Sequence, residues 1–451
     1  MTTTTPIRKP QHPAVKRALE ARAQTPKPPA VLDADWLRAL CLECGADDVG
    51  FVSLERTELN DQRAEILRVF PHTKALVSFV CRMNREPVRS VARSKANHEF
   101  HRTQDAAEHV AHEIARRLED IGVRALNEPV AFPMEMAGFP DVKSWTISHK
   151  PIAVAAGLGQ MGIHRNVIHP KFGNFVLLGT VLVDRAIGRE TQPIEYNPCF
   201  ECKLCVAACP VGAIGADGHF DFGACINHNY REFMGGFVDW VDTVTDSRDS
   251  SAYRARYSSG ETASVWQSLS IGAQYKSANC MAVCPAGDDV IGPYLADKAG
   301  HARDVLRPLQ DKEETLYVVG GSDADHYAQK RFPHKRVKRI KSGLAPQTIQ
   351  GFVAFSHHFF QRHNAKGLEA TYHFRFTGKE PLEVTFHISS QTMNVQTGLH
   401  GTPSITVTAD SSSFLQIVAG RLSPVIAVLR GRLKLRGPRR LMDAFQRCFA
   451  T

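Results

Sequence analysis

The sequence of 451 residues lacks any run of about 18 consecutive apolar residues, so it predicts no membrane-spanning helix. Its first 30 residues contain neither an apolar segment nor the paired arginines of a twin-arginine signal, and we expect a cytoplasmic protein. This polar stretch, residues 1–30, predicts a disordered tail. The full sequence has 43% hydrophobic residues, which is typical of a globular chain, and it is long enough for several domains.

Acidic residues are too few to balance the basic ones, and the formal net charge is +9. Such a surplus can favour nucleic acid, because Lys and Arg release counterions from phosphates. However, the densest basic run, KRFPHKRVKRIK at 330–341, lies between two regions with clearer structural patterns. We therefore interpret residues 301–345 as a solvated basic linker, with a membrane surface or an acidic protein as alternative partners. Nucleic-acid binding is not expected.

Cysteine is scarce outside one segment, since seven of the 11 cysteines lie between Cys199 and Cys284. A secreted disulfide protein would spread them through a short chain, whereas clustered thiols indicate metal ligation in a reducing compartment. The other four cysteines are interpreted as ordinary packing residues: Cys41, Cys44, Cys81 and Cys448.

Helical and strand patterns alternate over residues 31–190. KALVSFVCRM at 74–83 predicts a buried strand, and TQDAAEHVAHEIARRLEDIGVRAL at 103–126 predicts an amphipathic helix running into a strand. The alternation predicts an α/β domain. A cysteine-rich segment follows over 191–300, and a last domain begins after the basic linker. We detect no internal repeat.

The strongest motif is CFECKLCVAACP, residues 199–210, a C-x2-C-x2-C-x3-C-P run. Three of its thiolates would surround one iron–sulfur cubane, while the fourth cysteine reaches a second cluster. The first cluster is therefore predicted to be held by Cys199, Cys202, Cys205 and the distant Cys284. Zinc, which also takes four thiolates, is the alternative. The proline and a downstream C-x3-C-P favour iron–sulfur.

The second cluster lacks one expected thiolate. Its predicted cysteine ligands are Cys209, Cys225 and Cys280. In SANCMAVCPAG, residues 277–287, the position where a fourth cysteine is expected holds Ser277. Either a serine oxygen completes a four-iron cluster, or Asn279 or His228 does, or the cluster has three irons. A degraded or single-cluster protein is the remaining alternative.

AGLGQMG at 156–162 fits G-x-G-x-x-G through Gly157, Gly159 and Gly162, and Asp184 follows at a suitable distance. A dinucleotide fingerprint must open a long helix, but Pro170 and Gly173 interrupt the chain soon afterwards. A nicotinamide site is therefore disfavoured.

The same glycine segment, followed by the cysteine run, ACINHNY and CMAVCP, resembles epoxyqueuosine reductase and the reductive dehalogenases from about residue 46 to 285. The resemblance implies an α/β domain that holds cobalamin beside a two-cluster ferredoxin-like module. Electrons from a ferredoxin, flavodoxin or reductase would pass through the clusters to cobalt and reduce an organic substrate. Gly157, Gly159 and Gly162 would then let the backbone approach the corrin ring.

One departure concerns proton donation. Where epoxyqueuosine reductase has a proton-donating aspartate, DVKSWTISHKP places Lys143, with Asp141 close by, so queuosine chemistry is not expected. His149 and Lys150 are the candidate proton donors, because His titrates near neutral pH and a buried Lys can be shifted toward it.

The C-terminal region resembles the sterol carrier protein domain over residues 346–451. Four segments alternate as strands, and helix, helix, strand and helix follow. The resemblance implies an apolar tunnel for a sterol, steroid or acyl compound. Candidate lining residues are Phe414, Leu415, Val418, Val425 and Val428.

The sequence thus predicts a multidomain protein: an α/β cobalamin-type domain, a dicluster ferredoxin-like module and an α+β sterol carrier domain. Two functions follow. The first is an iron–sulfur reductase, with one 4Fe-4S and one 4Fe-4S or 3Fe-4S cluster and with cobalamin, acting on a hydrophobic substrate. The second is a non-enzymatic electron-transfer protein with a lipid-binding or docking module.

Overall fold

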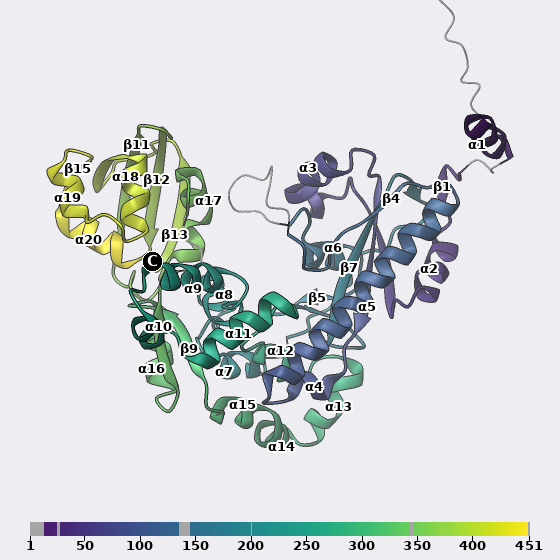
Figure 1. Ribbon diagram of the computed structural model, residues 1–451, viewed down its shortest axis with the longest axis horizontal. Helices are drawn as coiled ribbons and strands as arrows, with labels where there is room; N and C mark the ends of the chain where they lie inside the picture. Colours follow the sequence, from purple (N-terminus) through teal and green to yellow (C-terminus); the bar gives the residue numbers. More distant parts are fainter. Residues whose placement is uncertain (1–12, 25–27, 135–144, 200, 343–345, 450–451) are drawn as a thin grey trace, which may run out of the picture.

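The computed structural model describes residues 13–24, 28–134, 145–199, 201–342 and 346–449. Figure 1 shows an N-terminal sheet with helices, a middle region of short helices, and a C-terminal sheet with helices at the other side of the molecule. Within the described residues, no helix is both long and apolar enough to cross a membrane.

Helix α1, Pro13–Gln24, lies in the stretch predicted to be disordered, so that prediction is wrong for these residues. Its sequence PAVKRALEARAQ is rich in Ala, Leu, Lys and Arg, which favour helix even where little packs against them. The predicted tail over 1–12 lies outside the described residues.

The N-terminal region is built on a four-stranded sheet of order β2-β3-β7-β4. Its strands are β2 Asp48–Ser53, β3 Ala75–Arg82, β4 Ala125–Asn127 and β7 Val176–Val183. All three pairings are antiparallel, which the alternation of helices and strands along the sequence does not determine. Two short pairs accompany it: β1 Val31–Leu32 with β8 Ala186–Ile187, and β5 Gln160–Met161 with β6 Val167–Ile168.

Helices cover both faces of this sheet, which explains why strand β3 is buried at every position but its last. They are α2 Ala34–Glu43, η1 Thr57–Leu59, α3 Asn60–Val69, α4 Arg85–Arg89, α5 Arg93–Asp120 and α6 His149–Ala155. Val77 and Phe79 of β3 pack in the core shared with α2 and α5, whereas Leu76 packs with α3 and α6. Cys41 and Cys81 lie in the first of these cores, as expected of packing residues.

The middle region contains the clustered cysteines on short helices and loops. Its helices are α7 Leu204–Ala208, α8 Phe222–Asn229, α9 Gly235–Asp246, α10 Ser250–Arg256, α11 Ser259–Ser270, α12 Asn279–Ala282, α13 Asp288–Ala296, α14 Lys298–His301, η2 Ala302–Leu306 and α15 Arg307–Asp311.

The predicted linker is a folded unit, so the interpretation of 301–345 as a solvated linker is wrong. Strand β9 Thr315–Val319, helix α16 Asp323–Arg331 and strand β10 Arg336–Ile340 form a β-α-β unit with parallel strands. Leu316, Val318 and Phe332 are buried in a core shared with Cys205 and Cys209. The basic run misleads because its charges occupy the exposed side of α16 and β10, while buried Lys335 pairs with Glu314 at 2.7 Å.

The C-terminal region has the predicted order of elements around a sheet of order β13-β12-β11-β14-β15. The elements are α17 Ile349–Phe359, β11 Ala370–Thr377, β12 Leu382–Ser389, β13 Thr392–Thr397, β14 Ile405–Asp410, α18 Ser411–Val418, α19 Pro424–Leu429, β15 Leu433–Arg436 and α20 Arg439–Arg447. One pairing differs from the expected antiparallel arrangement, because β11 and β14 run parallel.

Aromatic rings fill the space between this sheet and its helices. Phe414 lies 5.0 Å from Phe352 and 5.0 Å from Phe376, measured between ring centroids. Leu415 and Val418 pack against the same core. Two predicted lining residues lie elsewhere: Val425 and Val428 on α19 are 56% and 46% exposed, so their assignment to an internal tunnel is wrong. Apolar spacing on a helix does not reveal which residues face the solvent.

The C-terminal region packs directly on the cysteine region. The ring of Phe222, at the start of α8, lies 4.8 Å from that of His358 on α17. Arg362 pairs with Asp217 at 2.9 Å, and the backbone N–H of Asp323 donates to Gln361. Because α8 also carries Cys225, the two regions meet at an element of the predicted second cluster.

Candidate functional site

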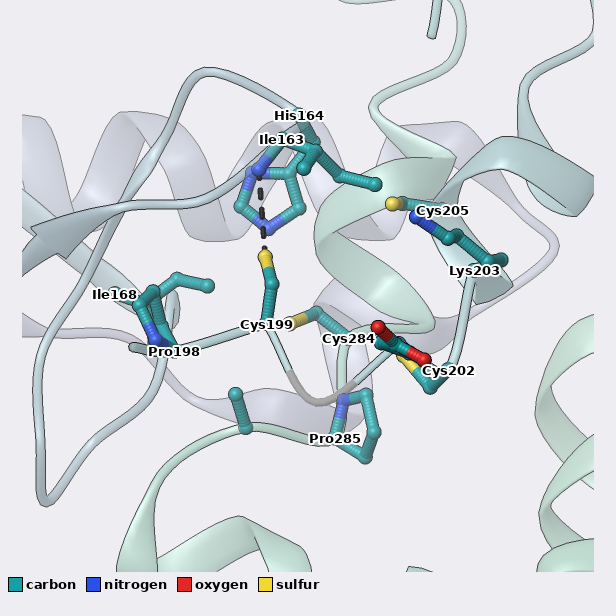
Figure 2. Close-up of a pocket in the computed structure, with 12 residues that line it drawn as sticks. Ile163, His164, Ile168, Pro198, Cys199, Cys202, Lys203, Cys205, Cys284 and Pro285 are labelled. Carbon is teal, nitrogen blue, oxygen red and sulfur yellow. Dashed lines mark hydrogen bonds between the residues drawn. The ribbon is translucent and has the colours of Figure 1, made fainter. Parts of the chain in front are cut away.

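Four cysteines predicted to hold the first cluster line one pocket. Cys199, Cys202, Cys205 and Cys284 surround it together with Ile163 and His164, as Figure 2 shows. The backbone N–H of Ile163 donates to the Cys199 sulfur at 3.4 Å. Cys284, which follows Cys205 by nearly 80 positions in the sequence, thus lies beside the first motif.

The predicted cubane would separate its thiolates around a body of several atoms. Among the described residues, no group of three or more His, Cys, Asp and Glu side chains that could hold a single metal ion is found. Burial raises the pKa of Cys280 and of Cys284 to about 12, so these sulfurs would be neutral thiols unless a metal displaced their protons.

The two cysteine loops are copies of one another, an internal repeat that sequence reasoning missed. CKLCVAACPVG at 202–212 and SANCMAVCPAG at 277–287 share five identical positions. The backbone repeats too: Lys203 and Ala278 have φ values of 52° and 54°, and each precedes a short helix, α7 or α12. Gly212 and Gly287 follow the two Cys-Pro pairs with φ values of 66° and 108°.

This repeat places Ser277 at the position that Cys202 occupies in the first loop. Ser277 is buried, and its backbone is held by Asn229, which accepts from its N–H at 3.0 Å, and by Arg93, which donates to its carbonyl at 2.6 Å. Its hydroxyl makes no hydrogen bond to any described residue. The position equivalent to Cys199 is Gln274, and Cys225 on α8 brings a thiolate from outside the repeat.

The two alternative oxygen and nitrogen ligands differ in their surroundings. Asn279 donates from Nδ2 to the carbonyl of Ala208, next to Cys209, and its buried Oδ1 has no partner among the described residues. Nε2 of His228 is likewise unpartnered. The charges that act on His228, however, are those of Glu314, Lys312 and other lysines rather than cysteine thiolates. Asn279 is therefore the better placed of the two.

Lys150 is the cation beside the second set of cysteines. Its ammonium donates to the carbonyl of Arg165 at 2.7 Å and to Asn166 Oδ1 at 3.2 Å. Burial lowers the pKa of Lys150, and the charges of Cys225 and Cys280 oppose that shift. A cation at this place favours electron-rich states of a cluster.

His149, the other candidate proton donor, is fully hydrogen-bonded. Its Nε2–H donates to the carbonyl of Pro129 at 2.9 Å, so Nδ1 accepts from the Thr180 hydroxyl at 2.9 Å. Burial lowers the pKa of His149. Through these contacts the neutral ring of His149 connects the start of α6 to Thr180 on β7 and to Pro129, so it holds the helix in place. Lys143 and Asp141 lie outside the described residues.

An aromatic group beside the second set of cysteines was missed from the sequence. Tyr230 lies 5.5 Å from Phe233 and 5.6 Å from Tyr275, and Phe132 contacts Phe233 at 5.4 Å, all between ring centroids. Burial raises the pKa of Tyr230, and the charges of the nearby cysteines raise it further. Neither tyrosine hydroxyl has a hydrogen-bond partner among the described residues. The only signal in the sequence was Tyr230 at the end of ACINHNY.

Glu128 is a second residue that sequence reasoning missed. It directly follows β4 and precedes Pro129, whose carbonyl binds His149. Its side chain is buried, and Oε1 has no partner among the described residues. Desolvation by burial raises the pKa of Glu128 to about 7, so this carboxyl holds a proton near neutral pH.

The glycine loop packs against the protein itself. A Cβ on Gly157 would lie 2.3 Å from the carbonyl oxygen of Gln192, and one on Gly159 would lie 2.4 Å from that of Ile168. A Cβ on Gly162 would meet the ring of His164 at 2.8 Å. These glycines therefore serve internal packing rather than an open cradle. The loop also follows helix α6 and enters strand β5, the reverse of a dinucleotide fingerprint.

The fold and site define an α/β protein with a duplicated cysteine module and a separate α+β domain. Comparison with known protein families finds a similarity for each of these two parts. Residues 358–450 match the SCP-2 sterol transfer family. The chain is 30% identical over 245 residues to epoxyqueuosine reductase of Shewanella oneidensis, covering 52% of this chain and 54% of the relative. It is 32% identical over 114 residues to that of Vibrio cholerae, covering 25% of this chain and 30% of the relative.

Solved structures similar to this chain include an epoxyqueuosine reductase with a tRNA stem loop (16% identity, 43% of this chain, 56% of that chain, TM-score 0.32). A catabolic reductive dehalogenase in complex with 3-bromo-4-hydroxybenzoic acid is another (17% identity, 61% of this chain, 35% of that chain, TM-score 0.38). The chain spans about a third to a half of the curated relatives it matches. The predicted resemblance, an epoxyqueuosine reductase-like part joined to a sterol carrier domain, is confirmed.

Proposed function

We propose that this protein is an iron–sulfur reductase that acts on a hydrophobic organic substrate held or delivered by its C-terminal domain. The observation that carries the proposal is the duplicated cysteine loop with Lys150 and the Tyr230–Tyr275 aromatic group beside its second half. The first cluster would use Cys199, Cys202, Cys205 and Cys284, and the second Cys209, Cys225, Cys280 and Ser277.

Electrons would enter at the first cluster and leave from the second. Cys199 and Cys202 are partly exposed on this pocket, so an electron donor such as a ferredoxin, flavodoxin or reductase could approach the first cluster. The second cluster would face Lys150 and Tyr230, where a reduced substrate needs protons. Lys150 is the donor that best fits this role, because His149 is bonded at both nitrogens.

Cobalamin enters the proposal through the resemblance to epoxyqueuosine reductases and reductive dehalogenases. When bound, it would supply one-electron redox chemistry at cobalt, with the clusters as the source of electrons. The predicted glycine contact does not fit, because the space beyond each glycine is filled by the protein's own backbone or His164. The aromatic group beside the second cluster is the surface where a corrin would be sought instead.

The test is anaerobic reconstitution of the full chain with iron and sulfide, followed by cobalamin. We expect about seven or eight irons per chain, two redox transitions, and a stoichiometric corrin complex with a shifted visible spectrum. Gly159→Val is uninformative, because its Cβ would clash with Ile168 in any case. Protein with both clusters intact that ignores cobalamin would support the electron-transfer alternative, in which the C-terminal domain serves as a lipid-binding or docking module. The expectation that nucleic acid is not a partner stays a prediction.

The C-terminal domain is expected to bind a fluorescent fatty acid or sterol in the full chain. A ligand would have to share the interior with the rings around Phe414, so Phe414→Trp should weaken binding roughly tenfold by adding bulk there. Titration by fluorescence measures this, with melting temperature recorded in parallel. Val238→Trp, at an exposed position of α9, introduces the same indole side chain elsewhere and should leave binding unchanged. Equal effects of both variants would argue for a docking role.

A further inference from the structure

Helix α19 presents an apolar surface that nothing in the described chain covers. Four of its six residues are apolar and exposed: Val425 at 56%, Ile426 at 42%, Val428 at 46% and Leu429 at 82%. Leu429 is the most exposed large apolar side chain of the described residues. Only Ala427 faces inward and is fully buried. The helix therefore packs on the domain through one small residue, while its four larger apolar side chains are exposed to solvent.

The surroundings of this helix are strongly basic. Between positions 421 and 440 the sequence contains seven Lys and Arg residues and no Asp or Glu. All seven are exposed: Arg421, Arg430, Arg432, Lys434, Arg436, Arg439 and Arg440. Arg432 turns toward Ser413, whose hydrogen bond, with a smaller contribution from the charge of Arg432, lowers the pKa of Asp410. The other six make no ion pair with a carboxylate of the described residues.

The fold gathers these charges around the apolar residues. Helix α19 leads through Gly431 into β15, the edge strand of the sheet, whose Lys434 and Arg436 point outward while Leu433 is buried. Helix α20 then starts with Arg439 and Arg440. Figure 1 shows α19, β15 and α20 together at one outer side of the molecule, away from the N-terminal sheet. The surface is therefore free to meet a large flat partner.

We propose that α19 and its basic surroundings dock the protein on an anionic lipid bilayer. Valine, isoleucine and leucine side chains gain free energy by entering the acyl boundary, while arginines beside them attract phosphate headgroups. An acidic protein would match the charge, but the four exposed apolar side chains of α19, at positions 425, 426, 428 and 429, share one face of the helix, as in helices that lie in a membrane interface. Docking there would place the C-terminal domain where a lipid ligand is exchanged. This inference stands independently of the redox chemistry.

The experiment is flotation of the full-length protein with vesicles of phosphatidylcholine alone or mixed with phosphatidylglycerol. We expect binding to the mixed vesicles, weak binding to phosphatidylcholine alone, and a loss when salt rises from about 0.1 M to about 1 M. The double variant Val425→Ser, Leu429→Ser should bind at least roughly tenfold more weakly. Arg430→Glu with Arg439→Glu should have a similar effect and remove the dependence on anionic lipid.

Matched controls lie on other faces of the molecule. Leu295→Ser on α13 removes an apolar side chain that is 58% exposed, and Arg254→Glu on α10 reverses an exposed charge. Both should bind vesicles like the wild type, and circular dichroism should show that all variants remain folded. The proposal is overturned if the wild type binds neither vesicle, which would leave an acidic protein as the occupant. It is equally overturned if the α19 variants and the controls lose binding alike.

Discussion

Ser277→Cys is expected to give a protein whose second cluster keeps four irons in air. In the wild type, that site should lose iron on exposure to oxygen and show the paramagnetic signal of an oxidised three-iron cluster, because an alcohol is a weaker iron ligand than a thiolate. The repeat supports this expectation, since Ser277 stands where Cys202 stands in the first loop and Ala278 matches the φ of Lys203. Iron analysis and electron paramagnetic resonance before and after air exposure measure the change.

The repeat also provides the control. Cys202→Ser puts the same weakness into the first loop, so it should make the first cluster labile while leaving the second as in the wild type. The Ser277→Cys and Cys202→Ser double variant should then exchange the behaviour of the two sites. An iron content near four per chain in the wild type, with a single redox transition, would contradict the two-cluster arrangement.

Lys150→Met is expected to lower the reduction potential of the second cluster by on the order of 100 mV. In general, two unit charges roughly 7 Å apart interact by about 2 kcal/mol at an effective dielectric constant of about 20, which corresponds to about 100 mV for a one-electron couple. Loss of the cation should also lower the rate of substrate reduction strongly, by removing the proton donor, and leave a residual activity. Redox titration followed by spectroscopy measures the potential, and iron content shows whether both clusters remain.

Lys203→Met is the matched variant in the first loop. Lys203 borders the first pocket and donates to the Ala216 carbonyl, so its loss should affect the first transition and leave the second unchanged. If Lys150→Met leaves both potentials unchanged while iron is retained, the cation does not act on the second cluster.

The dependence of the wild-type activity on pH is expected to follow from Lys150. Burial places the pKa of Lys150 below its ordinary value, so activity should fall as pH rises through that lowered pKa, and this alkaline limb should be absent from residual activity of Lys150→Met. The effect of Lys150 on the stability of the fold has the opposite direction to its effect on activity. Between the folded and unfolded pKa values the unfolded chain binds more protons, so the contribution of Lys150 to stability increases with pH.

Much of the site could be predicted because its chemistry is local. The C-x2-C-x2-C-x3-C-P run and its downstream C-x3-C-P contain six of the seven cysteines that we propose as cluster ligands, and ACINHNY contains the seventh, Cys225. Tyr275 and Glu128 could not be found in this way. Their surroundings are formed by segments far apart in the sequence. A single Tyr or Glu also belongs to no motif whose spacing would predict a function.

The linker interpretation failed for a related reason. In KRFPHKRVKRIK the charges are conspicuous and the buried positions are few, so the composition resembles a solvated segment. Strand β9 pairs with β10 and packs Leu316 and Val318 against the cysteine loops, and this burial compensates for the exposed charges on β10. The pairing of β9 with β10 depends on tertiary structure and cannot be predicted from the composition of the basic segment.

The sequence by itself determined the spacing of the clustered cysteines, the order of elements in the C-terminal domain and the buried character of strand β3, because ligand spacing and apolar periodicity are properties of neighbouring residues. Only the tertiary structure decided that Lys150 and Tyr230 lie beside Cys225 and Cys280, and that α16 with its strands is folded. It alone separated Phe414, buried among rings, from Leu429, exposed among arginines, since exposure depends on what packs against a side chain and not on the side chain itself.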